Sequence, residues 1–182
     1  MPLTQDEAAA ALGEIERTDR QTTELQVYEG AVPFFMVWGA VWVFGYMMTH
    51  FMPEYRNLFW ASGVATGTLF SIVLGQRQGN GGHNFSAWRY GAISAGLAGF
   101  FALTSFVLKL NVREIDAFVP LMFAGIYLAI GVFAGTRFAV CGAILAIATA
   151  VGFYNAGDHF GLWMAAAGGG VLLLTGFWLR RV

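Results

Sequence analysis

The feature that most constrains this chain is a series of six apolar stretches that contain no Asp, Glu, Lys or Arg. They cover residues 31–52, 57–74, 90–108, 117–135, 138–154 and 160–179. Each stretch has 17 to 22 residues, and about 20 residues of α-helix cross the roughly 30 Å hydrocarbon core of a bilayer. The whole chain is 57% apolar and only 12% charged, which is about half the charged fraction of a soluble domain. We therefore predict an all-α, polytopic membrane protein with a bundle of six transmembrane helices over residues 31–182.

The distribution of cations predicts how the bundle is oriented. Six spans place both ends of the chain on the same side of the membrane. That side then holds seven cations, which are Arg17, Arg20, Arg77, Arg89, Arg137, Arg180 and Arg181. The opposite side holds three, which are Arg56, Lys109 and Arg113. Because cytoplasmic segments carry an excess of Lys and Arg, we predict cytoplasmic termini in a multi-pass protein of a bacterial inner membrane.

The third and sixth spans resemble each other in sequence. Ile93–Lys109 and Met164–Arg180 share identical residues at six of seventeen positions. Pro33 and Pro120 strengthen the parallel, because we place them in the first turns of the first and fourth spans, where a missing N–H costs little. Two halves of three spans each would have opposite orientations, so this match predicts inverted three-helix repeats, an arrangement found in many transporters.

Small residues at four-residue spacing predict close contacts between helices in a membrane. We expect the third and sixth spans to be central, with Gly99 and Gly170 facing other helices. The glycine triplet at 168–170 is interpreted as a close helix contact, with a hinge as the alternative. The full set of predicted packing positions is Gly63, Gly67, Gly91, Ala95, Gly99, Gly131, Gly135, Gly168, Gly169 and Gly170.

The first 30 residues form a polar, acidic tail. Seven acids and two arginines give the tail a net charge of −5, and the five remaining arginines on the same predicted side give +5. Leu12 and Ile15 belong to an apolar stripe with helical spacing. We predict a short cytoplasmic helix that docks weakly across the inner face, with Leu12 and Ile15 turned inward. The arginines that would receive it are Arg77, Arg89, Arg137, Arg180 and Arg181. The alternative is a solvated tail.

Few side chains could carry chemistry. His50, Glu54, Asp158 and His159 lie on the predicted outer side and are weak candidates for a metal site. The loop Gly79–Asn84 lacks the Gly-Lys-Ser/Thr ending of a phosphate-binding loop. Polar residues within the spans, such as Ser71, Thr149 and Asn155, fit either a solute route or local hydrogen bonds. We find no catalytic set and no cofactor motif, and therefore expect no enzyme.

Two function classes remain after these exclusions. The first is a regulatory or adaptor protein, or a complex subunit, whose cytoplasmic tail binds a protein partner. The second is a small permease or channel for a neutral or lipidic solute, because an ion path would need charges within the spans. The charge-free bundle and the distinct tail favour the first class, whereas the repeat and the glycine triplet favour the second. Homo-oligomers fit either class, and no basic patch indicates nucleic acid.

Overall fold

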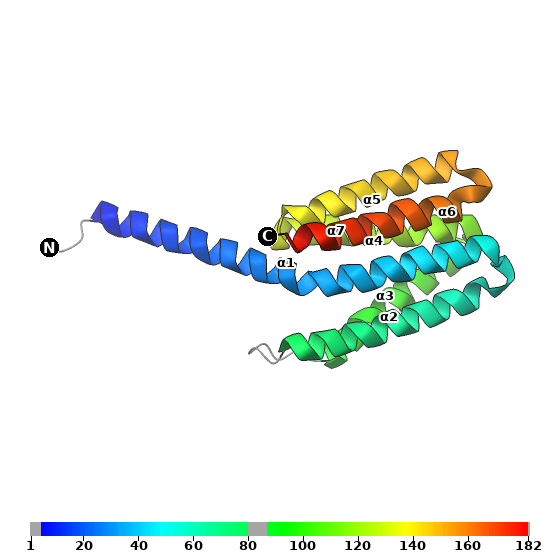
Figure 1. Ribbon diagram of the computed structural model, residues 1–182, viewed down its shortest axis with the longest axis horizontal. Coiled ribbons are helices and arrows are strands. Elements are labelled where there is room, and N and C mark those ends of the chain that lie inside the picture. The colour runs from blue at the N-terminus through cyan, green and yellow to red at the C-terminus, as the bar shows by residue number, and fades with distance from the viewer. Residues whose placement is uncertain (1–4, 80–86, 182) are drawn as a thin grey trace.

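The computed structural model describes residues 5–79 and 87–181. It describes their side chains from residue 11 onward, except at 16, 19–21, 78, 79, 87–91, 93 and 94. The described residues are helical apart from short connections. The helices lie side by side in an elongated bundle, and the N-terminal part of the first projects beyond it (Figure 1). The long helices are α1 (Gln5–Phe51), α2 (Arg56–Gly79), α3 (Ala87–Val107), α4 (Val112–Ala134), α5 (Thr136–Asn155) and α7 (Gly170–Leu179). The short elements are η1 (Pro53–Tyr55), η2 (Gly157–His159), α6 (Phe160–Met164) and the π-helical segment η3 (Ala165–Gly169).

Helix α1 differs from the predicted short tail helix. It is one continuous helix of 47 residues that joins the acidic tail to the first span. Among the described side chains of α1, Tyr28 is the first that is buried, and it is 3% exposed. We call residues 5–27 the stalk, because this part of α1 extends away from the bundle (Figure 1). No described residue of the stalk breaks the helical conformation, so the helix of the tail passes directly into that of the span.

The prolines correct two predicted helix starts. Pro33 lies inside α1 and Pro120 lies inside α4, so neither occupies a first turn. A proline inside a helix removes one backbone hydrogen bond, but neighbouring helices make such positions tolerable in membrane proteins.

The connection after the second predicted span is shorter than the gap between residues 74 and 90, because α2 continues to Gly79. That connection, with His83, lies outside the described residues.

The core is a layer of side chains between α1 and the helices α4, α5 and α7. Four aromatic residues of α1 form a buried stripe, which consists of Tyr28, Phe35, Trp42 and Tyr46. Phe35 packs against Tyr127 of α4 with ring centroids 5.2 Å apart, and Trp42 meets Phe123 edge-on at 5.8 Å. Helices α4 and α5 are joined through Gly135 alone and pack as antiparallel neighbours (Figure 1).

The sixth span packs centrally against α1 and α5, but it is divided into α6, η3 and α7. A Cβ placed on Gly169 would lie 2.5 Å from Val43 Cγ2 and 3.0 Å from the Val43 amide nitrogen. A Cβ on Gly168 would lie 2.7 Å from Met164 Cε of its own span and 3.4 Å from the Trp42 ring of α1. A Cβ on Gly170, in contrast, would meet nothing within 4 Å. The close contact with α1 therefore involves Gly169, and the inward position predicted for Gly170 is wrong.

Helix α3 makes slight contacts with the rest of the bundle. Phe101 stacks near Phe118 of α4, with ring centroids 6.1 Å apart. Ala95 and Gly99 are exposed, and a Cβ on Gly99 would meet nothing within 4 Å. The central position predicted for the third span is therefore wrong, while the surroundings of Gly91 lie outside the described residues. In an inverted repeat, the first span corresponds to the fourth and the third to the sixth. The extensive contact between α1 and α7 would then have a counterpart between α4 and α3, but the contact between the described parts of those two helices is slight.

The other predicted packing glycines lie against neighbouring helices. A Cβ on Gly63 would lie 3.2 Å from Val41 Cγ1, and a Cβ on Gly67 would lie 3.4 Å from Val41 Cγ2. These two positions bring α2 against α1. A Cβ on Gly131 would overlap the backbone of Ala139, so this glycine lets α4 and α5 approach closely.

Candidate functional site

Polar and charged contacts gather at the two ends of the bundle. We call the end from which the stalk projects the stalk end, and the end where Pro53 turns the chain from α1 into α2 the hairpin end. Between them, Thr149 donates to the Leu145 carbonyl at 2.7 Å and Ser71 to the Gly67 carbonyl at 2.8 Å, each within its own helix. Ser71 Oγ also accepts a hydrogen bond of 3.2 Å from Trp38 Nε1 of α1. Asn155, the last residue of α5, donates to the Val151 carbonyl at 2.8 Å.

Arg137 joins three helices at the stalk end. Its guanidinium carbon lies 5.3 Å from the ring centroid of Tyr28 on α1 and 5.0 Å from that of Trp178 on α7. Its Nη1 also donates a hydrogen bond of 2.8 Å to the Trp178 carbonyl oxygen. The position of Arg137 in the first turn of α5 places it beside the base of the stalk. We call Tyr28, Arg137 and Trp178 the collar, because they hold α1 where it leaves the bundle.

Gly135 supports the collar from the α4–α5 turn. Its φ of 119° favours glycine. A Cβ at this position would also overlap the hydroxyl of Tyr28 and the carboxylate of Glu24. Tyr28 donates a short hydrogen bond to that carboxylate, one turn earlier in α1. The turn, the stalk base and the collar are thus fitted to one another.

An open groove lies beside the collar. Its volume is about 640 Å³. The lining residues come from the stalk base and from the end of α4 with the following turn: Thr23, Glu24, Val27, Gly131, Val132, Phe133, Ala134, Gly135 and Thr136. Phe133 is 91% exposed, so the groove has an apolar rim with one carboxylate.

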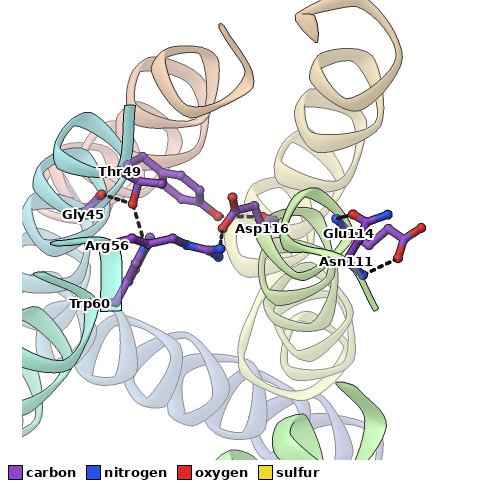
Figure 2. Close-up of polar contacts among 8 residues, drawn as sticks. Gly45, Thr49, Arg56, Trp60, Asn111, Glu114 and Asp116 are labelled. Carbon is purple, nitrogen blue, oxygen red and sulfur yellow. Dashed lines mark hydrogen bonds and ion pairs between the residues drawn. The ribbon is translucent and has the colours of Figure 1, made fainter. Parts of the chain in front are cut away.

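At the hairpin end, an ion pair connects α2 with α4. Arg56 Nη2 lies 2.5 Å from Asp116 Oδ1, and both side chains are largely buried (Figure 2). The Tyr46 hydroxyl of α1 donates to the Asp116 backbone oxygen at 2.8 Å. Three helices therefore converge on Asp116. The Arg56 Nε is buried and has no hydrogen-bond partner.

A second set of contacts holds α1 against α2 beside this ion pair. Trp60 Nε1 donates to Thr49 Oγ1 at 3.0 Å, and Thr49 donates to the Gly45 carbonyl at 2.8 Å (Figure 2). A Cβ on Gly45 would lie 3.1 Å from the Trp60 ring, so the indole lies close over the helix backbone. Gly45 therefore allows the contact that orients Trp60.

The start of α4 is fixed by a capping box. Asn111 Oδ1 accepts from the Glu114 amide at 3.0 Å, and Glu114 Oε2 accepts from the Asn111 amide at 2.7 Å (Figure 2). Each side chain satisfies a backbone group that the first turn leaves free. Arg113 donates to the Phe153 carbonyl of α5 at 2.5 Å. Residues 112–116, which lie between the predicted third and fourth spans, are therefore helical.

Two of the four candidate metal ligands come together. The rings of His50 on α1 and His159 in η2 lie with their centroids 5.6 Å apart, although 109 residues separate them. Gly161 permits this approach, because a Cβ there would lie 3.2 Å from the Tyr46 carbonyl and 3.4 Å from His50 Cβ. Among the described residues, no group of three or more His, Cys, Asp or Glu could hold a metal ion. Glu54 and Asp158 are exposed and do not complete such a group.

The predicted docking surface of the tail is not found in this structure. Leu12 and Ile15 are both 62% exposed on the stalk and do not face the bundle. Arg77, Arg180 and Arg181 are exposed, and Arg137 contacts α1 only at the base of the stalk. The side chain of Arg89 lies outside the described set. The tail does not dock because it continues the helix α1, and this helix points away from the face on which docking would occur.

Sequence reasoning missed the Arg56–Asp116 ion pair. The only available signal was that the two opposite charges directly precede the second and fourth spans on the same predicted side. It also missed the collar, because the stacking of Arg137 on Tyr28 joins residues 109 positions apart. Neither relationship has a local sequence pattern.

Among the described residues, five helical segments are long and apolar enough to cross a membrane, namely Thr22–Phe51, Pro53–Arg77, Val112–Ala134, Thr136–Asn155 and Gly157–Leu179. Their length and composition fit a helical membrane protein. The described apolar part of α3, Ala95–Val107, is shorter. Comparisons with protein-family models, with curated proteins and with solved structures give no match.

Proposed function

We propose that this protein is a multi-pass membrane adaptor that binds a protein partner through its stalk. The observation that carries the proposal is the exposure of apolar side chains on a continuous helical extension. Leu12 and Ile15 are each 62% exposed, and Leu25 is 39% exposed. Exposed apolar residues that recur on one face of a helix are typical of protein–protein contacts.

The threonines of the stalk extend this apolar stripe. Thr18 donates to the Glu14 carbonyl at 2.9 Å, and Thr22 donates to the Thr18 carbonyl at 2.8 Å. Because both hydroxyls bond to their own helix, a partner can cover the threonine methyl groups without leaving a hydroxyl unpaired. The stripe Leu12–Ile15–Thr18–Thr22 therefore suits burial against another helix.

The collar suits an adaptor because it joins the stalk to the bundle at one place. Tyr28 belongs to the helix that would bind the partner, whereas Arg137 and Trp178 belong to α5 and α7. A force or rotation of the stalk would therefore act first on these three side chains. The proposal assigns no catalytic step and no cofactor to the protein.

The orientation we propose places the stalk in the cytoplasm of a bacterial cell, with a sixth span formed by α3. The described arginines at the stalk end include Arg77, Arg137, Arg180 and Arg181, and cytoplasmic segments favour such an excess of cations. Labelling of introduced cysteines with an impermeant reagent, after replacement of Cys141, tests the orientation. Labelling from outside at position 77 would reverse it.

Site-specific photocrosslinking in cells tests the partner proposal. The crosslinking residue is placed at Leu12 or Ile15 on the stripe, and at Gly13 or Arg17 as matched positions on the opposite side of the helix. We expect one defined product from positions 12 and 15, and none from 13 and 17. The combined change Leu12→Ser and Thr22→Ser should abolish the product from position 15. Equal products from both faces, or no product at all, would exclude a specific contact on the stripe.

The second candidate function is passage of a neutral or lipidic solute. What favours it is the π-helical segment Ala165–Gly169 in the central span, because π-bulges are frequent at functional sites. Cysteines introduced at Thr149 of α5 and at Thr175 within this span, both of which are buried, discriminate between the candidates. Reaction with a small polar thiol reagent from both sides of the membrane would favour passage, whereas protection would favour the adaptor.

A further inference from the structure

We propose that His50 and His159 form a binding site for a divalent transition-metal ion at the hairpin end, with water completing the coordination. The proposal does not depend on the adaptor function. Its basis is the separation of 5.6 Å between the ring centroids of two imidazoles that are 109 positions apart in the sequence. Two imidazoles that share one tetrahedral ion, with metal–nitrogen bonds of about 2.0–2.1 Å, have centroids roughly 5–5.5 Å apart.

The backbone holds the two histidines in place before any ion binds. His50 lies in the last turn of α1, which ends at Phe51. His159 ends the η2 turn that precedes α6. Gly157 opens that turn with a φ of +51°, and Gly161 lets α6 approach the carbonyl of Tyr46. The separation of the two rings is therefore set by the packing of α6 against α1.

The chemistry of the pair selects the class of metal. Neutral imidazole is a good ligand for Zn²⁺, Ni²⁺ and Cu²⁺ and a poor one for Mg²⁺ and Ca²⁺, which prefer oxygen. His159 is exposed and His50 is half-buried, so an ion can reach them from solvent. Since the described residues offer no third ligand in place, the site has open coordination positions and binds reversibly.

An ion bound to both rings would tie the end of α1 to the α5–α6 connection. The two elements already contact each other there through Gly161, so binding requires little movement. The expected consequence is a metal-dependent gain in stability of the folded bundle.

Calorimetric titration of the purified full-length protein with Zn²⁺ tests the proposal; the protein carries no polyhistidine tag. We expect one site, whose affinity falls at least about tenfold in His50→Ala and in His159→Ala, because each variant loses the intramolecular second ligand. His83→Ala is the matched control, since it removes the third histidine of the chain. Mg²⁺ should give no heat of binding.

A spectroscopic readout separates the two-histidine site from binding elsewhere. The electron paramagnetic resonance spectrum of bound Cu²⁺ should show coupling to two imidazole nitrogens in the wild type and to one in either single variant. Thermal unfolding of the metal-free variants checks that they remain folded. If Zn²⁺ affinity and the Cu²⁺ spectrum were unchanged in folded His50→Ala, the proposal would be overturned. A loss of Zn²⁺ affinity in His83→Ala alone would also overturn the proposal.

Discussion

The guanidinium of Arg56 on α2 and the carboxylate of Asp116 on α4 lie 2.5 Å apart, and they form the one ion pair among the described side chains. The pair joins the start of α2 to the first part of α4. At the same place, the Tyr46 hydroxyl of α1 donates a hydrogen bond to the Asp116 backbone oxygen. The ion pair links α4 to α2, a helix that otherwise packs mainly against α1. It therefore adds to the contacts that hold the hairpin end together.

Replacing Asp116 by Ala should destabilise the bundle, because it leaves the charge of Arg56 buried without a partner. Breaking a fully buried pair costs about 3–5 kcal/mol, and an exposed pair is worth about 0–1 kcal/mol. With side chains 13–16% exposed, we expect a loss of about 2 kcal/mol. Equilibrium unfolding in mixed micelles measures it.

Glu54→Gln is the control for the Asp116 change, because it removes an exposed carboxylate near Arg56 in sequence and should leave stability unchanged. The paired replacement Arg56→Met with Asp116→Leu should recover most of the loss, since no charge then remains buried. A paired variant no more stable than Asp116→Ala would show that the charges themselves are needed.

The neighbouring glycines Gly169 and Gly170 should respond oppositely to alanine. At Gly169 a Cβ would lie 2.5 Å from Val43 Cγ2 and 3.0 Å from its backbone nitrogen, so Gly169→Ala should cost about 1–3 kcal/mol. At Gly170 the space is open, and alanine should be neutral or stabilise the helix by up to about 1 kcal/mol. Thermal unfolding in detergent measures both. Equal losses at the two positions would contradict the assigned contact with α1.

Gly135 is expected to be the more sensitive of two glycines with positive φ. Gly135→Ala combines a strained φ of 119° with overlap on Tyr28, whereas Gly157→Ala has a φ of 51° and open space. Strain alone costs roughly 1–2 kcal/mol, so we expect that loss in Gly157→Ala and at least about 2–4 kcal/mol in Gly135→Ala. Comparison of the two unfolding midpoints is the measurement. A smaller loss at Gly135 would mean that the collar adapts readily.

The stalk should exchange its amide hydrogens much faster than the rest of α1. Residues 11–25 have mostly exposed side chains, and a helix without tertiary contacts is only marginally stable in water. Hydrogen exchange should also be alike at 0.1 M and 1 M salt, although the screening length falls from about 10 Å to about 3 Å. Residues 35–46 serve as the protected internal reference. Slow exchange of the stalk at low salt that becomes fast at high salt would instead indicate docking on the arginines.

Local sequence patterns determined the class of the protein and most of its helices. Five of the six predicted spans correspond to helices long and apolar enough to cross a membrane, because span length and the absence of charge are properties of contiguous residues. The predicted gaps between spans, at residues 53–56 and 136–137, lie at or next to the observed turns at Pro53 and Gly135. The positions of the helix ends were predicted less well. Residues 75–79 and 112–116 continue helices, because polar residues beyond a span can extend a helix when they have caps or solvent to bond to.

Tertiary structure alone decided which residues meet. Gly169 and Gly170 are chemically identical neighbours, yet only Gly169 contacts Val43, because successive residues in a helix point about 100° apart. The ion pair of Arg56 with Asp116 and the pairing of His50 with His159 join residues 60 and 109 positions apart. Such contacts depend on the rotation and translation of whole helices, which are set by the sum of all packing interactions. The continuity of the stalk with α1 likewise decided that Leu12 and Ile15 lie away from the bundle, because a helix that continues straight from a span extends away from the face where the span ends.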